Sequence, residues 1–145
     1  IGSNVPITDT GAAAENLQGV GPPIFVQAGA VWYAGDLIGV NSSGAWVRAD
    51  ANAPIGPLMV AGSSAKLDER GVPLYMGALV RGGRYSGGVA GSLLYTSATA
   101  GLVAEAIATG MGVTMPVGWT INDNTVFLLP TMSLYAVLAN TRTSA

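Results

Sequence analysis

Short apolar runs alternate with turn-forming residues along most of this chain. From residue 24 onward each run is only a few residues long, and Gly, Pro, Asn, Asp or Ser bounds most of them. Runs this short favour strands, because helices of globular proteins usually need about ten or more residues. The pattern predicts strands at 24–27, 31–33, 37–40, 45–49, 58–61, 72–80, 93–96, 102–104, 114–120 and 125–129. Closely spaced short strands are typical of an all-β sandwich or barrel.

One arrangement of strands and turns occurs twice. In each copy a glycine opens an apolar strand, a turn of small residues follows, a short strand returns, and a Pro-(Ile/Val)-Gly step leads into a third strand. The copies cover residues 35–60 and 91–121, with the proline steps at 54–56 and 116–118. Since one such unit cannot bury its apolar face alone, we expect the two copies to pack together in one small β-barrel or β-sandwich.

The beginning of the chain differs from the rest. Residues 1–23 show no sustained hydrophobic period, and glycines and a Pro-Pro pair exclude a long helix there. We therefore expect them to form an extended N-terminal arm that stays disordered or becomes ordered against a neighbour instead of joining the core. A length of 145 residues indicates one domain. Residues 24–138 are predicted to form this β domain, and residues 139–145 a polar C-terminal tail.

Charge is scarce in this chain. Charged residues make up 10% of it and hydrophobic residues 50%, whereas an ordinary soluble domain is about 25% charged. So little charge indicates a surface that a partner covers. No membrane-spanning helix is expected, because no apolar run approaches the ~18 residues that one needs. No nucleic-acid binding is expected either, because the net charge is −2 and the six Lys and Arg residues are scattered.

Residues able to carry chemistry are few. The chain has neither His nor Cys, so imidazole catalysis, thiolate nucleophiles and the usual zinc ligands are excluded. Asp36 directly precedes a strand and is expected to order its turn. Together with Asp9 and Asp50 it could form a carboxylate site only through tertiary structure, and a carboxylate-based hydrolase is the weakest alternative. We predict no catalytic residue, no cofactor and no metal site.

Two further charged or glycine-rich segments have simple interpretations. The acidic pair at 68–69 is flanked by Lys66 and Arg70, which is typical of a solvated loop. Arg81 and Arg84 border two glycines and are expected in a solvated loop, with a phosphate or carboxylate contact as the alternative. The glycines at 82–91 lack the Lys-Ser/Thr of a P-loop and the strand–turn–helix context of a dinucleotide fingerprint, so they indicate hairpins and barrel corners.

The aromatic residues are the remaining candidates for binding. In a β domain, Trp and Tyr most often lie in the core or in a subunit interface. Their faces could instead stack on sugar rings. The residues concerned are Trp32, Tyr33, Trp46, Tyr75, Tyr85, Tyr95, Trp119 and Tyr135.

Several of these segments together resemble a known family. Residues 35–44, 49–51, 54–56 and 91–103 are similar to the small capsid decoration, or cement, proteins of tailed bacteriophages, and the resemblance covers roughly residues 28–130. It implies a small β-barrel or β-tulip-like domain with an extended N-terminal arm. It also implies homotrimers on the outer surface of an icosahedral head, where they bridge major capsid protein subunits.

The resulting hypothesis is a non-enzymatic structural protein of the virion. Its partners would be the major capsid protein and further copies of itself, without nucleic acid or membrane. The alternative is the trimeric base, or a glycan-binding domain, of a phage head fibre or tail spike. The residues expected to contact the capsid or another subunit are Val5, Ile7, Leu17, Val20, Pro22, Pro23, Trp32 and Tyr33.

Overall fold

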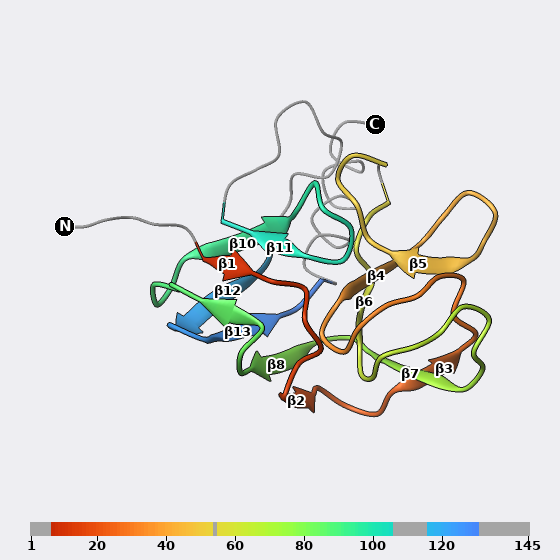
Figure 1. The fold of residues 1–145 in the computed structure, drawn as a ribbon, viewed down its shortest axis with the longest axis horizontal. Coiled ribbons are helices and arrows are strands. Elements are labelled where there is room, and N and C mark those ends of the chain that lie inside the picture. The colour runs from red at the N-terminus through yellow and green to blue at the C-terminus, as the bar shows by residue number, and fades with distance from the viewer. Residues whose placement is uncertain (1–6, 54, 106–115, 131–145) are drawn as a thin grey trace, which may run out of the picture.

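The chain is built of β-strands throughout the part that the structure describes. The computed structural model describes residues 7–53, 55–105 and 116–130. These residues contain thirteen strands and no helix (Figure 1). The predicted all-β class is therefore confirmed.

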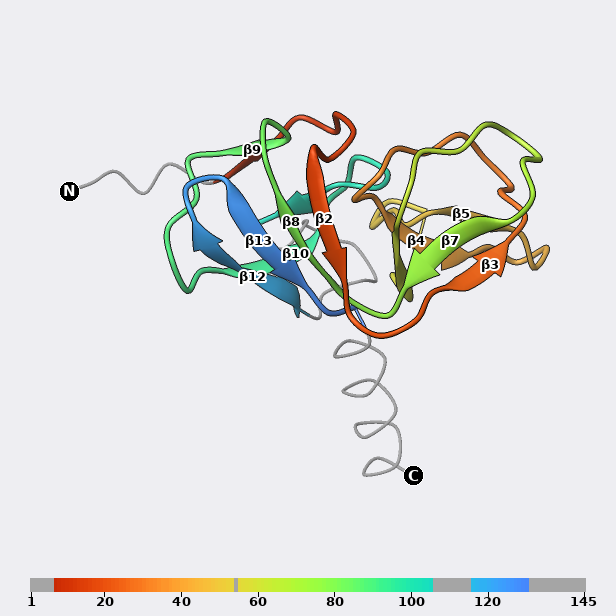
Figure 2. The ribbon, with the colours of Figure 1, turned by 90° about the horizontal axis from the view of Figure 1, so that it is seen from below.

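The strands form three antiparallel sheets. The five-stranded sheet has the order β3 (Ile24–Val26), β7 (Val72–Tyr75), β6 (Met59–Ala61), β4 (Leu37–Val40) and β5 (Trp46–Arg48). The six-stranded sheet has the order β11 (Val103–Ala104), β10 (Leu93–Thr96), β12 (Pro116–Asn122), β13 (Thr125–Leu128), β8 (Ala78–Arg81) and β2 (Asn16–Gly19). The third sheet pairs β1 (Thr8–Asp9) with β9 (Tyr85–Ser86). The two larger sheets lie side by side in Figure 2.

None of the three sheets closes into a barrel. The ends of the five-stranded sheet approach each other where Ala28, just after β3, forms a single bridge with Trp46 of β5. The Gly29 amide also donates a hydrogen bond of 2.7 Å to the Trp46 carbonyl. No ladder of paired strands joins these ends. The arrangement is therefore sandwich-like, and a closed barrel is not formed by the described strands.

The two larger sheets repeat one strand order. Residues 24–75, here called the first unit, contribute β3, β4, β5, β6 and β7, whereas residues 78–128, the second unit, contribute β8, β10, β11, β12 and β13. When the five strands of each unit are numbered along the chain, their order across the sheet is first, fifth, fourth, second, third in both units. The opening glycines, Gly35 and Gly91, both have positive φ, 95° and 85°, which glycine adopts without steric cost. The predicted internal repeat is confirmed, and each copy includes one more strand before it and one more after it in the sequence.

The strand register changes how the two copies align. Val60 and Trp119 occupy equivalent positions, because Val60 of β6 lies opposite Leu37 of β4 and Trp119 of β12 lies opposite Leu93 of β10. Counting back three residues from each places Pro57, and not Pro54, at the position of Pro116. The apparent match of the two Pro-(Ile/Val)-Gly steps is thus displaced by three residues.

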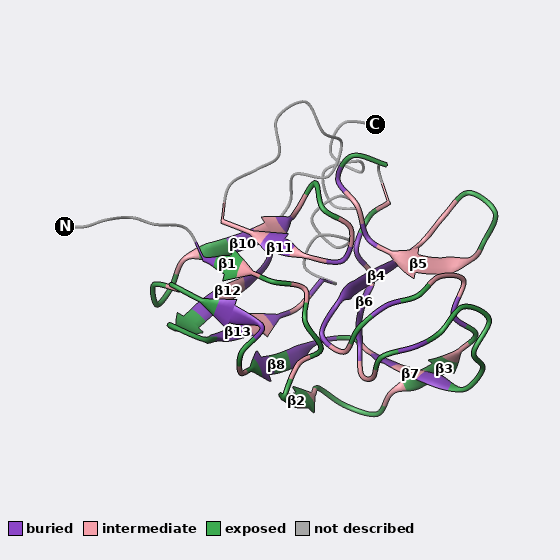
Figure 3. Cartoon of the chain, viewed as in Figure 1, coloured by how far each residue is buried: buried purple, intermediate pink, exposed green. Residues whose placement is uncertain are grey.

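Two apolar clusters form the core. One lies inside the first unit around Trp32, Ile38 and Leu74. The other lies inside the second unit and also takes in Leu37 and Val60 of the first unit. Neighbouring side chains point to opposite faces of a strand, so Ile38 reaches one cluster and Leu37 the other. This double use explains why β4 and β6 are buried almost throughout (Figure 3).

Residues 7–19 belong to this fold and are not a free arm. Here β1 pairs with β9, and β2 extends the six-stranded sheet by pairing with β8. Ile7 is only 6% exposed and lies in the second cluster, against which Leu17 also packs. The expectation that residues 1–23 remain outside the core is therefore wrong for residues 7–19, because pairing with strands far along the chain holds them. Residues 1–6, 131–138 and the tail at 139–145 lie outside the described residues.

Candidate functional site

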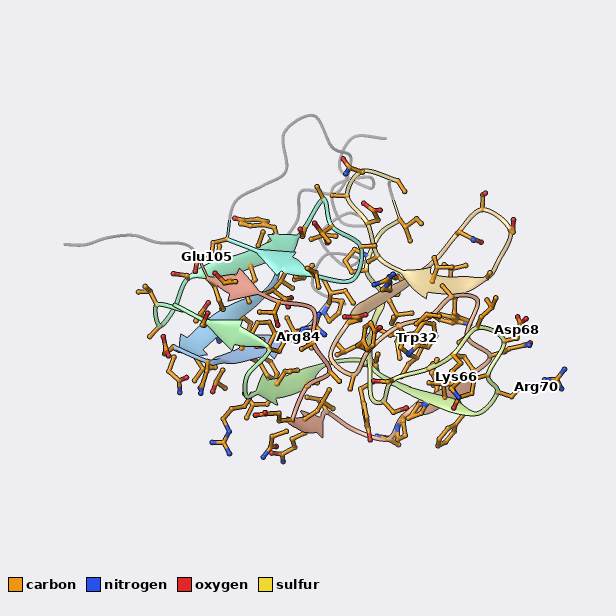
Figure 4. All side chains as sticks on the ribbon, in the orientation of Figure 1. Trp32, Lys66, Asp68, Arg70, Arg84 and Glu105 are labelled. Carbon is orange, nitrogen blue, oxygen red and sulfur yellow. The ribbon has the colours of Figure 1, made fainter. Side chains whose placement is uncertain are left out.

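A cluster of three charged side chains lies buried where the two units meet. The Arg84 guanidinium places Nε 2.9 Å from Asp9 Oδ1 and Nη2 2.7 Å from Asp36 Oδ1. Arg84 is 1% exposed and Asp36 is fully buried. Figure 4 shows Arg84 pointing into the middle of the molecule. The cluster joins β1, the start of β4 in the first unit, and the β8–β9 turn of the second unit.

Backbone groups satisfy most of the remaining bonding capacity of the cluster. Arg84 donates to the carbonyls of Ala34 at 3.2 Å and Gly101 at 3.2 Å. The Asp36 carboxylate accepts from the Tyr33 amide at 3.0 Å, so Asp36 orders its turn as expected. The Asp9 carboxylate accepts from the amides of Gly11 and Val103, and Arg84 also reaches the Ala12 carbonyl. These bonds tie the N-terminal segment to both units.

The electrostatics of the cluster reflect its burial. Burial raises the pKa of Asp36 above its ordinary value of 3.8, and the neighbouring positive charge of Arg84 opposes that rise only in part. The Arg84 guanidinium also lies 5.6 Å from the centre of the Tyr85 ring, in cation–π geometry. Burial raises the pKa of the Tyr85 hydroxyl as well. The phenol therefore stays neutral, and the carboxyl groups of Asp9 and Asp36 are the ones that pair with Arg84.

Close packing seals the cluster from solvent. Gly101 has φ of +83°, and a Cβ atom there would lie 2.9 Å from Asp36 Cγ and 2.8 Å from Arg48 Cδ. Such contacts are closer than real Cβ atoms make, so only glycine fits. The guanidinium and both carboxylates are thus enclosed by protein, and the cluster acts as an internal tie with no opening to a substrate.

Other kinds of site find little support in the described ranges. Among those residues no group of three or more acidic side chains is placed to hold a metal ion. No helix in the same residues is long and apolar enough to cross a membrane.

The residues expected to contact a partner differ widely in exposure. Trp32 is fully buried, and its indole N–H donates to the Ser63 carbonyl at 3.2 Å, so it cannot touch a partner directly. Ile7 is buried in the other cluster. Tyr33 and Val20 are each 44% exposed. Pro22 is exposed and Leu17 and Pro23 are half-buried, whereas Val5 lies outside the described residues.

The two charged segments have different outcomes. Asp68, Glu69 and their basic neighbours are exposed at one end of the first unit (Figure 4), as a solvated loop requires. Arg81 is exposed and also fits that interpretation. Arg84 does not, because its carboxylate partners lie inside the protein. The alternative of a carboxylate contact is the correct one for Arg84.

The outer face of the second unit carries a row of large apolar side chains that sequence reasoning did not identify. Leu93 lies opposite Trp119, Trp119 opposite Phe127, and Phe127 opposite Leu79. The Trp119 and Phe127 rings are 5.1 Å apart between centroids. Leu79 is 37% exposed and Leu93 47%. We call these four residues the outer row.

Polar side chains border the outer row. A shallow depression of about 290 Å³ lies beside Leu79, and Ile121 is its other large apolar residue. Its remaining lining is Asn16, Gln18, Arg81, Asn122 and Thr125. An apolar centre with an amide-rich border is the usual anatomy of a protein–protein contact.

A second depression lies where the ends of the five-stranded sheet approach each other. It measures about 440 Å³ and is lined by Phe25, Gln27, Trp46 and Asp68, among others. Phe25 is 67% exposed. The depression therefore brings aromatic faces together with a carboxylate and an amide.

Comparison with known proteins identifies no relative. No protein-family model, no curated protein and no solved structure matches this chain. Function is therefore inferred from the surfaces and clusters described above.

Proposed function

We propose that this chain is a capsid decoration protein of a tailed bacteriophage. It binds the outer surface of an icosahedral head as a homotrimer and bridges major capsid protein subunits. The observation that carries the proposal is the outer row, a contiguous apolar strip left partly exposed on a regular sheet. The resemblance of residues 28–130 to capsid decoration proteins adds the phage context.

Exposed apolar surface supports assembly as the role of this chain. Single exposed apolar residues are normal on proteins, but contiguous apolar strips mark interaction sites. Here the strip occurs in a chain of which only 10% is charged. A standard protein–protein contact buries about 1,600 Å² in total. Repeating such a contact around a shell lets individually modest contacts hold strongly.

The buried charge cluster supports a structural, non-enzymatic role. Asp36 has the perturbed pKa that often marks a catalytic acid, yet it is enclosed and bonded to Arg84 and the Tyr33 amide. Its position suits a protein that must stay rigid under load. Exposed Val20, Pro22 and Tyr33 remain available for contact with the capsid.

Binding to heads tests the proposal. Purified chain is mixed with heads of the parent phage that lack it, and the heads are pelleted. We expect saturable binding at many copies per head, and heads that survive heating or chelation better than undecorated ones. Absence of binding at any concentration, with the chain folded, would contradict the proposal.

A glycan-binding domain of a fibre or spike is the second candidate, and the 440 Å³ depression favours it. Its test is titration of the chain with neutral oligosaccharides, followed by NMR. Shifts that centre on Trp46 and disappear in Phe25→Ala and Asp68→Ala would support it. Uniformly unchanged spectra would exclude this site.

A further inference from the structure

The outer row has a counterpart in the first unit. With the two units aligned on their opening glycines, Leu93 corresponds to Leu37 and Trp119 to Val60. The counterpart row continues from Val60 to Tyr75 across β6 and β7, just as the outer row continues from Trp119 to Phe127 across β12 and β13. The same face of the same sheet is therefore present twice in the chain.

The two faces differ in what covers them. Leu37 and Val60 are fully buried, because the second unit packs its own core against them. At the equivalent positions of the second unit, Leu93 is 47% exposed and Trp119 is half-buried. Within one chain, the equivalent sheet face is therefore covered in the first unit and partly open in the second.

We propose that the outer row is the contact between copies of this chain. The inference rests on the self-association in the proposed function and is independent of the capsid. Around a threefold axis the three outer faces meet one another and exclude water from Leu93, Trp119, Phe127 and Leu79. This assigns the subunit interface to the outer side of β10, β12, β13 and β8.

The apolar face alone is smaller than a standard contact. Six strands spaced about 4.8 Å apart and about four residues long give a face of roughly 24 Å by 13 Å, or ~300 Å² in plan, whereas a standard interface buries ~800 Å² per partner. The proposed contact therefore also buries the polar border of the row.

The chemistry of the face fits a second copy better than a partner of a different kind. The outer row itself carries no charge, so it does not demand a partner of opposite charge. Its border includes the amides Asn16, Gln18 and Asn122, and an amide can both donate to and accept from an identical group.

Charged substitutions in the row test the proposal. Leu93→Glu and Leu79→Glu are compared with Leu67→Glu, a matched control at a 59% exposed leucine on the first unit. Sedimentation velocity over a wide concentration range measures self-association, and circular dichroism measures folding. We expect each row variant to weaken self-association at least tenfold, which is about 1.4 kcal/mol, and the control to change it less than twofold. Two folded row variants that associate like the wild type would overturn the proposal.

Spin labels give a second readout that does not depend on a destabilising change. The chain has no cysteine, so Leu93→Cys and Leu67→Cys each provide a single labelling site. We expect short distances between copies labelled at Leu93, and longer ones at Leu67. Long distances at Leu93, or a chain that stays monomeric, would contradict the interface.

Head binding separates this inference from the proposed function. Wild-type chain that self-associates through the outer row but ignores heads would leave the interface standing and remove the capsid role. Row variants that lose head binding while they still self-associate would assign the row to the capsid and overturn the interface.

Discussion

Replacing Arg84 with Met should destabilise the fold more than any surface charge change. The substitution keeps much of the side-chain volume but leaves Asp9 and Asp36 buried with no positive partner. It also leaves the carbonyls of Ala34 and Gly101 without their donor. Removing one partner of a buried ion pair costs about 3–5 kcal/mol. Because Arg84 serves two carboxylates, we expect a loss of at least 3 kcal/mol.

Urea unfolding followed by tryptophan fluorescence measures the effect, since Trp32 is fully buried and reports on the core. With a urea dependence of about 1–3 kcal/mol per molar, the midpoint should fall by more than ~1 M. All samples are held at one protein concentration, because self-association adds apparent stability. Arg70→Met, at an exposed loop position, is the control and should change stability by no more than about 0.5 kcal/mol.

Two further variants make the test specific. Arg84→Lys keeps the positive charge but loses the planar guanidinium whose several N–H groups reach both carboxylates. Its free energy of unfolding should therefore lie between those of the wild type and Arg84→Met. The deficit of Arg84→Met should shrink as the pH falls, because protonation removes the unpaired negative charges. If Arg84→Met stayed within 1 kcal/mol of the wild type at neutral pH, the role assigned to the cluster would be refuted.

Three other predictions follow from the packing and the pKa shift. Deleting residues 1–23 removes β1 and β2, so the melting temperature should fall by well over ten degrees or the chain should fail to fold; calorimetry showing a shift of a few degrees would contradict their place in the core. A Cβ atom on Gly118 would collide with the Phe127 carbonyl oxygen, whereas one on Gly56 would meet nothing, so Gly118→Ala should cost about 1–3 kcal/mol more than Gly56→Ala in urea titrations, and equal effects would refute the close approach. Because the folded state raises the pKa of Asp36 above 3.8, the stability that its proton provides is full below that value and is lost as the pH rises through the raised pKa. The stability of Asp36→Asn relative to the wild type should therefore rise as the pH rises above 3.8, and parallel stability–pH curves would exclude this titration.

Local chemistry was enough to predict the turns and the repeat. In the turn predicted for the first copy of the repeat, the Asn41 side chain accepts hydrogen bonds from the amides of Ser43 and Ala45 at 3.0 Å. Gly44 and Gly101 lie in the turns of small residues predicted for the two copies, and their φ angles are 81° and 83°. These features depend on residues close together in the sequence, so the sequence alone reveals them.

Contacts between distant segments could not be predicted in this way. Arg84 lies 75 residues from Asp9, and nothing in the glycine-rich segment around Arg84 distinguishes a buried arginine from a solvated one. The two-residue strand β1 likewise has no periodicity of its own.

The outer row was missed for a related reason. Leu93 and Leu94 are neighbours of the same type, yet Leu93 is 47% exposed and Leu94 is fully buried. A strand that is apolar on both faces does not reveal which face the rest of the chain covers. Only the packing of the two units distinguishes the open face from the closed one.

A reconstruction of the parent virion tests the central claim most directly. The account predicts that density matching the two side-by-side β units recurs in groups of three over the outside of the capsid, with the outer faces of the six-stranded sheets turned toward one another. Density for this fold confined to a fibre or spike, or missing from the head, would contradict the claim that this chain decorates the shell.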